Sequence, residues 1–296
     1  MRRKPSHEDH LMRIALLLSL VAFIVSSAFV APGADDVKKS PVAAAVESDR
    51  VLVIAHRGDS KVAPENTLPA FESAVKVGVD FVELDYYHST DDALVVFHDK
   101  TLDRCTDACQ KWGGQKIPIT KKSLADLRTL DAGTWFNAKF AGTKIPTLEE
   151  ALEVIQPGSM TLIERKGGNA AACVELLKRK KLVPRVAVQA FDWKYLADMH
   201  RLAPEIVLGA LGDKQLTPAR LAEIDASGAR FVGWNHEDLT KADIDALHAK
   251  GLKAWVYTVD DPKVANRLLD WGIDGLISNT PARMKEMVAR HPRAAN

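Results

Sequence analysis

The sequence has few cysteines, almost no excess of charge and no internal repeat, and each absence narrows the range of functions. Its 296 residues carry 40 Lys and Arg against 39 Asp and Glu, a net charge of +1. Proteins that bind nucleic acid through its phosphates present a strongly basic face, and neither the charge nor any motif indicates one. We therefore expect no nucleic-acid partner. With no low-complexity tract, the chain is typical of one globular domain.

Only three cysteines are present, Cys105, Cys109 and Cys173. A structural zinc site needs Cys or His ligands at short spacings, and the segment 105–109 offers too few. In an oxidising compartment two cysteines in one short loop can pair, so we expect a disulfide between Cys105 and Cys109. We expect Cys173 to be a small buried side chain on a helix.

The N-terminus combines basic residues, an apolar run over 14–25 and the small residues Ser26, Ser27 and Ala28. This order is typical of a secretory signal, so we expect residues 1–28 to direct export to the periplasm or beyond, with cleavage after Ala28. The alternative is an uncleaved anchor over 14–30, close to the length of a membrane span, which would keep the protein near a membrane. Residues 29–50 have the composition of a flexible linker. The folded domain then covers 51–296.

Short apolar runs alternate with helical patterns over nearly all of the remaining chain. The strands expected from these runs are 51–55, 81–86, 93–97, 160–164, 185–190, 206–211, 230–233, 252–259 and 275–277. The helices expected between them are 68–77, 147–155, 170–180, 193–202, 219–226, 241–249 and 262–271. This alternation predicts an α/β fold with a parallel sheet and helical crossovers.

Nine strands are one more than a closed eight-stranded barrel requires. The connection from residue 86 to 93 is too short for the dozen or so residues that rejoin parallel neighbours, and it is rich in turn-forming residues. The run 93–97 should therefore return antiparallel, as a hairpin on the second strand. The remaining eight strands, each followed by a helix, predict a (βα)8 TIM barrel. Residues 100–145, with a short helix near 123–128, form an insertion after the hairpin, and such long insertions tend to be functional.

Polar side chains gather at the carboxyl ends of the predicted strands, where TIM barrels carry their active sites. They are His56 and Arg57 after the first strand, Glu83 and Asp85 on the second, His98 after the hairpin, Glu164 and Lys166 after the next strand, and Tyr257 near the end of 252–259. Two carboxylates at alternate positions of one strand point the same way and can share a hard cation. A third carboxylate and no cysteine favour Ca2+ or Mg2+ over zinc.

The other side chains of this group suit work on a phosphate ester. Two imidazoles can act as acid and base near neutral pH. Arg57 and Lys166 can hold phosphate oxygens and stabilise developing charge. Glu65 lies in a turn before the next helix, where Asn66 or Thr67 can cap that helix and Glu65 can brace either the turn or Arg57. We favour Glu65 as a support for its neighbours at the site. Together these residues predict metal-assisted cleavage of a phosphate ester.

The combined motifs also resemble those of a known family. HRG, APENT, ELD and FHD, followed by IPTLEEAL, IERK, VQAFD and DGLISN, resemble the glycerophosphodiester phosphodiesterases, which have a phospholipase-C-like barrel. The resemblance extends from about Val51 to the C-terminal end. It implies hydrolysis of a small-molecule glycerophosphodiester to glycerol 3-phosphate and an alcohol. It also implies one Ca2+ or Mg2+ ion on Glu83, Asp85 and Glu164, His56 and His98 as the acid–base pair, and Arg57 and Lys166 on the phosphate.

Three departures from the family pattern bear on these expectations. Glu164-Arg165-Lys166 stands where the family usually has Glu-Ile-Lys and keeps both functional ends. Tyr257-Thr258-Val259-Asp260 stands for the usual Trp-Thr-Val-Asn, and the segment 105–109 replaces a Thr-rich turn. The last two affect substrate choice, and we expect Tyr257 to contact the substrate.

Two alternatives keep the barrel but change its function. One is a lysophospholipid or phosphoinositide phosphodiesterase at a membrane, which would need an apolar lip around Trp112, Trp135 and Phe136. The other is a binding protein that has lost catalysis. The complete set of His56, His98 and three carboxylates argues against this second alternative.

Overall fold

The computed structural model describes residues 40–292, and the predicted signal, the predicted anchor and residues 29–39 of the predicted linker lie outside this range. Within it, no helix is both long and apolar enough to cross a bilayer.

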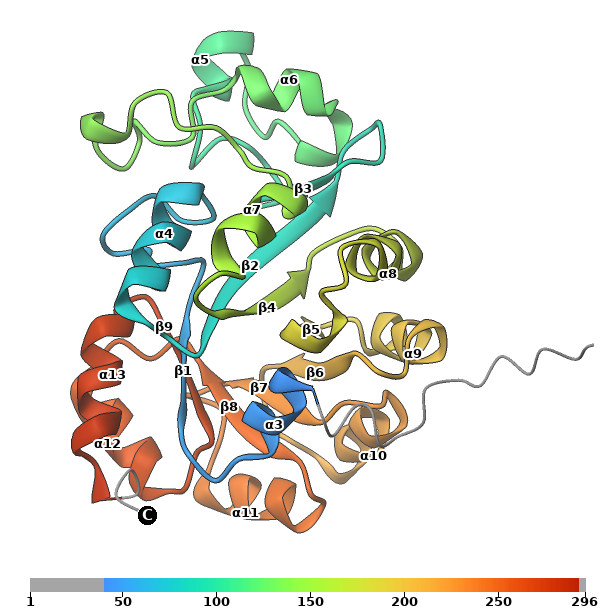
Figure 1. Cartoon of the computed structure of the whole chain (residues 1–296), viewed down its shortest axis with the longest axis vertical. Coiled ribbons are helices and arrows are strands. Elements are labelled where there is room, and N and C mark those ends of the chain that lie inside the picture. The colour runs from blue at the N-terminus through green and yellow to red at the C-terminus, as the bar shows by residue number, and fades with distance from the viewer. Residues whose placement is uncertain (1–39, 293–296) are drawn as a thin grey trace, which may run out of the picture. The chain divides into compact units, whose positions relative to one another are not determined.

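Eight parallel strands form the barrel (Figure 1). They are β1 (Leu52–Ala55), β2 (Phe81–His88), β4 (Met160–Arg165), β5 (Val186–Ala190), β6 (Val207–Gly212), β7 (Phe231–Asn235), β8 (Lys253–Tyr257) and β9 (Gly275–Ser278). The strands pair in the order β1-β9-β8-β7-β6-β5-β4-β2, and the pairing of β1 with β2 closes the ring. The predicted TIM barrel is therefore confirmed.

The ninth strand, β3 (Leu94–Val96), runs antiparallel to the end of β2, with Tyr86 opposite Val96 and His88 opposite Leu94. This confirms the predicted hairpin. β2 continues two residues beyond its predicted end because β3 supplies hydrogen-bonding partners for that extension. The chain leaving β3 returns to the barrel mouth and carries His98 there.

Helices surround the strands in Figure 1. They are α4 (Leu68–Val77), α7 (Leu148–Ile155), α8 (Ala170–Arg179), α9 (Trp193–Leu202), α10 (Pro218–Ala226), α11 (Lys241–Ala249), α12 (Pro262–Asp270) and α13 (Pro281–Arg290). The seven helices expected from the sequence are present, each with ends within one residue of the prediction. Several begin at strong caps. Thr147, for example, accepts a hydrogen bond from the backbone of Glu150, whose side chain bonds back to the cap.

A short helix, α3 (Pro41–Glu47), covers the amino-terminal end of the barrel. Its side chains Val42 and Val46 are buried in the same cluster as Leu52 and Phe81, which begin β1 and β2. The prediction of a flexible linker over 29–50 is thus wrong for α3. Ser40 caps the helix by accepting a hydrogen bond from the Ala43 amide, 3.0 Å long. The helix exists because its apolar face closes the barrel core.

The insertion, residues 100–145, forms a lobe beside the β2–β3 hairpin (Figure 1). It contains α5 (Ala108–Trp112), α6 (Leu124–Thr129) and the 3-10 helices η1 (Ile119–Lys121) and η2 (Ala138–Phe140). α6 confirms the helix expected near 123–128. Apolar side chains such as Leu102 and Leu127 form a cluster of their own with the hairpin.

The structure contradicts the expected disulfide, because all three cysteines are free thiols. Cys105 is buried in the apolar cluster of the insertion, whereas the thiol of Cys109 lies beside the Asp103 carboxylate. The two thiols thus lie in different environments, although they are close in the sequence. Cys173 is buried on α8, as expected.

Candidate active site

A sharp turn after β1 places His56 and Arg57 at the carboxyl end of the barrel. Arg57 and Gly58 both have positive φ, 57° and 83°. A Cβ atom on Gly58 would lie 2.7 Å from the Ala70 carbonyl carbon, so only glycine fits here. The turn also points the Arg57 amide at Glu83, whose Oε2 accepts its hydrogen bond at 2.7 Å. The backbone at the end of β1 is in this way attached to β2.

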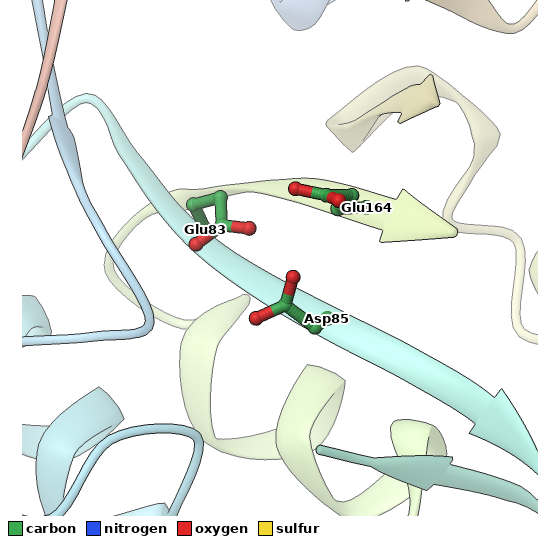
Figure 2. Close-up of side chains that lie close together, drawn as sticks. All are labelled: Glu83, Asp85 and Glu164. Carbon is green, nitrogen blue, oxygen red and sulfur yellow. The ribbon is translucent and has the colours of Figure 1, made fainter. Parts of the chain in front are cut away.

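Three carboxylates lie together between β2 and β4, as Figure 2 shows. Glu83, Asp85 and Glu164 each offer one oxygen, and these oxygens lie within 4.8 Å of one another. All three side chains are buried. The register of the sheet explains the cluster, because Asp85 pairs directly with Glu164, and Glu83 lies two residues earlier on the same face of β2.

The electrostatics of the carboxylate cluster are unfavourable without a cation. Burial raises the pKa of Glu83 well above its usual value, and the charges of Asp85 and Glu164 raise it further. Burial, followed by the charge of Asp85, raises the pKa of Glu164 to about 7. Burial also opposes ionisation of Asp85, but the charges of Lys166 and Arg57 lower its pKa to about 2. Full ionisation of all three groups at neutral pH thus calls for additional positive charge.

The donor set fits a hard divalent cation. Glu83 Oε1 is buried and has no partner, and the buried oxygens Asp85 Oδ1 and Glu164 Oε1 have no partner other than the Lys166 ammonium. The other oxygens of Glu83 and Asp85 are held by the Arg57 amide and by the Asn66 side chain, at 2.7 Å each. Three clustered carboxylates, two of them fixed in this way, and no sulfur ligand suit Ca2+ or Mg2+.

Two cationic side chains border the cluster. Lys166 Nζ lies 3.2 Å from Asp85 Oδ1 and also contacts Glu164. Arg57 Nη1 donates to Glu65 Oε1 at 2.8 Å, and its Nε lies 3.6 Å from Asp85. The contact expected between Glu65 and Arg57 is therefore present. Asn66, by contrast, binds Asp85 instead of capping α4.

His56 is oriented by an amide that is itself held in place. Its Nδ1 lies 2.7 Å from Asn279 Oδ1, while Asn279 Nδ2 donates to Asp260 Oδ2 at 2.8 Å. Because the carboxylate of Asp260 can only accept, the amide oxygen of Asn279 must face His56. His56 Nδ1 then carries the hydrogen, and Nε2 keeps a free lone pair. Burial, together with the charge of Arg57, lowers the pKa of His56 to about 4, so the ring is neutral near pH 7.

His98 is oriented by its sequence neighbour. Its Nδ1 donates to Asp99 Oδ1 at 2.7 Å, which leaves Nε2 as the ring nitrogen available at the mouth. Asp99 also accepts hydrogen bonds from Arg104 of the insertion. The sequence did not single out either residue.

A cavity of about 220 Å3 joins these groups. Its charged and imidazole groups come from β1, β2, the hairpin and β4, whereas the later strands supply mainly apolar and aromatic side chains together with Gln189 and Thr258. The lining residues are His56, Arg57, Glu83, His98, Glu164, Lys166, Gln189, Phe191, Leu211, Tyr257, Thr258 and Ile277. A larger groove of about 420 Å3 between the hairpin, α7 and α8 contains none of the predicted site residues.

The part of the cavity formed by the later strands contains residues that sequence reasoning missed. Gln189 is only 2% exposed, and its Oε1 has no hydrogen-bond partner. Phe191 is 49% exposed, and its ring meets that of Tyr257 edge to face at 6.2 Å. Tyr257 lines the cavity, but its hydroxyl donates to the Gly212 carbonyl at 2.8 Å. Gln189 and Phe191 both belong to the VQAFD motif, and this motif is the sequence feature that could have indicated them as site residues.

The fold and the site define a class: a TIM-barrel enzyme whose mouth combines clustered carboxylates with cationic and imidazole side chains. Comparison with known proteins identifies the family within that class. The family model for the glycerophosphoryl diester phosphodiesterase family matches residues 56–283. The chain belongs to the glycerophosphodiester phosphodiesterase family and is an enzyme, in contrast to the inactive binding protein considered from the sequence.

Individual relatives agree with this assignment. The chain is 33% identical over 270 residues to the glycerophosphodiester phosphodiesterase of Bacillus subtilis, a match that covers 82% of this chain and 89% of the relative. It is 32% identical over 250 residues to the enzyme of Caldanaerobacter subterraneus subsp. tengcongensis, covering 81% and 99%. Among solved structures, an Oleispira antarctica phosphodiesterase in complex with the product sn-glycerol-3-phosphate superimposes with a TM-score of 0.73 at 30% identity, covering 80% of this chain and 96% of that one.

Proposed function

We propose that the protein hydrolyses glycerophosphodiesters to sn-glycerol 3-phosphate and an alcohol such as choline, ethanolamine or glycerol, with the help of one divalent cation. The observation that carries this proposal is the cluster of three buried carboxylates, whose oxygens lie within 4.8 Å of one another, next to two imidazoles with fixed orientation. The product complex of the Oleispira antarctica relative supports a glycerophosphate-type ligand.

Glu83, Asp85 and Glu164 would hold a Ca2+ or Mg2+ ion, which polarises a phosphate oxygen when it is bound. Arg57 and Lys166 bind the remaining non-bridging oxygens and stabilise the charge that develops on them. Both side chains line the cavity beside the carboxylates. The phosphate is in this way positioned at the polar side of the cavity.

The two imidazoles divide the proton transfers. His56 Nε2, which has a free lone pair, accepts the proton of the nucleophile, either water or a glycerol hydroxyl of the substrate. As the nucleophile bonds to phosphorus, the phosphorus–oxygen bond to the alcohol breaks, and protonated His98 donates its Nε2 proton to the leaving oxygen. With water as the nucleophile this step gives glycerol 3-phosphate directly. With the glycerol hydroxyl it gives a cyclic phosphate, and a water deprotonated by the then neutral His98 opens the ring while the protonated His56 returns its proton to the glycerol oxygen. Because the Tyr257 hydroxyl already has an acceptor, we expect the ring of Tyr257 to contact the substrate, together with Phe191.

The test is release of glycerol 3-phosphate from glycerophosphocholine, glycerophosphoethanolamine and glycerophosphoglycerol. The protein is first stripped with EDTA and then assayed with Ca2+ or Mg2+. We expect EDTA to abolish turnover and one of these ions to restore it. Metal-independent turnover would refute the role of the cation.

His56→Ala and His98→Ala test the acid–base assignment. Each should lower kcat by about 100-fold or more while the protein stays folded, because general acid–base catalysis contributes about 10²–10⁴-fold. His200→Ala, at an exposed position on α9, is the matched control and should be fully active. Near-normal activity of either site variant would exclude that histidine from proton transfer.

A second candidate substrate is a lysophospholipid. Among residues 40–292, three of the four exposed large apolar side chains, Val62, Trp135 and Phe191, lie on loops that follow the carboxyl ends of strands or in the insertion. Of the lip expected from the sequence, only Trp135 is exposed, at 38%, while Trp112 and Phe136 are half-buried. A cavity of 220 Å3 is smaller than the about 300–1,000 Å3 of pockets for drug-sized ligands, so an acyl chain would have to lie on this lip.

Trp135→Ala distinguishes the two substrates. If the protein is a lysophospholipid phosphodiesterase, this variant should lose activity toward lysophosphatidylcholine and keep activity toward glycerophosphocholine. We expect glycerophosphocholine to be the better substrate of the native protein, since it requires no contact outside the cavity.

We also propose, from the sequence of residues 1–28, that the protein is exported. N-terminal sequencing of the mature protein from the periplasmic fraction tests this proposal. A start at Phe29 would indicate cleavage, whereas an intact Met1 in the membrane fraction would indicate an anchor over 14–30.

A further inference from the structure

Arg104, at the start of the insertion, binds two carboxylates that come from different parts of the barrel mouth. Its Nε and Nη2 donate to Asp99, at 2.6 and 3.0 Å. Its Nη1 and Nη2 donate to Glu65, at 2.9 and 2.7 Å. Glu65 precedes α4 and Asp99 follows β3, so a single guanidinium bridges the β1 side and the hairpin side of the mouth.

Each of these carboxylates in turn holds one group of the cavity. Asp99 accepts the hydrogen bond from His98 Nδ1, and Glu65 accepts the hydrogen bond from Arg57 Nη1. His98 and Arg57 both line the 220 Å3 cavity, whereas Arg104 does not. The chain of contacts therefore runs from His98 through Asp99, Arg104 and Glu65 to Arg57.

The guanidinium has the geometry that this bridge requires. Its planar array of N–H donors can bind two carboxylates by pairs of hydrogen bonds, which fixes the distance and the angle between them. Without it, Glu65 and Asp99 would be two like charges with no shared partner. A lysine ammonium is a point charge and cannot make both paired contacts at once.

Stability alone does not account for the bridge. The Arg104 side chain is 46% exposed, and exposed ion pairs contribute little to the free energy of unfolding. The same insertion contains Arg128, whose ion-pair partner Glu150 does not line the 220 Å3 cavity. The partners of Arg104 therefore bind side chains of the cavity, whereas Arg128 forms an ion pair outside it.

We propose that Arg104 is a positioning residue, which sets the relative placement of His98 and Arg57 through Asp99 and Glu65. The insertion then completes the active site without touching the substrate. This inference rests on the proposed function for its kinetic test.

Arg104→Met should lower kcat for the best glycerophosphodiester by about 10–100-fold, the usual effect of losing a group that orients active side chains. KM should change much less, because Arg57 and Lys166 remain to bind phosphate. Arg104→Lys should recover only part of the loss. Arg128→Met, which removes the same charge from the same insertion, should leave kcat within about twofold of the native value.

A double-mutant comparison identifies the route of the effect. In the Glu65→Gln, Asp99→Asn background both partners have lost their charge, so the further change Arg104→Met should lower the residual kcat by no more than about twofold. A full, independent loss in that background would overturn the proposal. So would native-like kcat in Arg104→Met.

A measurement without substrate separates this proposal from the proposed function. The imidazole 15N resonances of His98 should shift or broaden in Arg104→Met and remain native-like in Arg128→Met. Unchanged His98 resonances in both variants would overturn the positioning role, whether or not the native protein releases glycerol 3-phosphate. If the His98 resonances change in Arg104→Met but the native protein releases no glycerol 3-phosphate, only the proposed function is refuted.

Discussion

Asp260 accepts hydrogen bonds from both the backbone and the side chain of Asn279, and it thereby decides which ring nitrogen of His56 is free. The Ser60 hydroxyl donates to the same amide oxygen that faces His56, at 3.0 Å. At the scale of single residues, the charge of Asp260 therefore acts on the proton position of His56 without lying in the cavity. The change from the family's usual Asn to Asp at this place affects the base more directly than substrate choice.

Asp260→Ala removes the acceptor that fixes the Asn279 amide. The amide can then rotate, and His56 loses its preferred tautomer, so we expect kcat to fall by about 10–100-fold. Asp260→Asn keeps an oxygen acceptor and should retain most of the activity. Steady-state kinetics on glycerophosphocholine measure both variants, and equal kcat for Asp260→Ala and the native protein would contradict the expected linkage.

The charged residues that line the cavity could be predicted from the sequence, whereas the residues that orient them, Asp99, Arg104 and two neutral amides, could not. Glu83, Asp85 and Glu164 are recognisable because carboxylates at strand ends are unusual and their spacing places them on one face. Asn66 and Asn279 lie in the APENT and DGLISN motifs, but nothing in these motifs indicates which groups their side chains bind. Their roles depend on partners 19 and 223 residues away along the chain, which become neighbours only when the barrel closes.

At the scale of elements, the helices with a long, regular apolar pattern could be predicted from the sequence. The short helix α3, which depends on the rest of the fold, could not. The helices around the barrel have several turns and clear apolar faces. α3 has only seven residues, too few for a stable helix in isolation. It forms because the barrel end offers Leu52 and Phe81 as an apolar surface, information that its own sequence does not contain.

Val42 on α3 is fully buried, so Val42→Ala should lower the free energy of unfolding by about 2 kcal/mol. The reason is the loss of apolar contact with the barrel core. Ala44→Ser, on the exposed side of the same helix, should change stability by no more than about 0.5 kcal/mol. Urea unfolding measures both values.

The folded Val42→Ala variant should keep native kcat, because α3 lies at the end of the barrel opposite the active site. A variant with native stability would show that α3 does not close the core. Loss of kcat in the still folded protein would show that the two ends of the barrel are coupled.

On the scale of the whole molecule, the carboxylate cluster couples barrel stability to metal and pH. Its ligands come from β2 and β4, while Arg57 attaches β1 to β2 through Glu83. A cation that binds only the folded barrel stabilises the whole barrel, by about 2.7 kcal/mol when its concentration is 100 times Kd. The same carboxylates bind protons, so a metal on the proposed site would compete with protons for it.

The sign of this competition follows from the raised pKa values of Glu83 and Glu164. A carboxyl group whose pKa is higher in the folded than in the unfolded state is more protonated when folded, so its contribution to stability is present at low pH and is lost as the pH rises through the folded value. For Glu164 that value is about 7. The metal-free protein should therefore lose stability from these groups between about pH 5 and pH 8. His56 acts in the opposite direction, but only below its unfolded value of about 6.5.

Metal reverses this trend because it binds the ionised carboxylates. The rise in Tm on adding Ca2+ or Mg2+ should be small at pH 5, where protons occupy the site, and large at pH 8, as thermal unfolding with and without the ion can measure. Glu164→Gln is the matched control: it removes one of the repelling charges, so it should raise the metal-free Tm at pH 8 and reduce the effect of the metal at both pH values. An equal metal-induced rise at pH 5 and pH 8 in the native protein would mean that the ion binds elsewhere than on these three carboxylates.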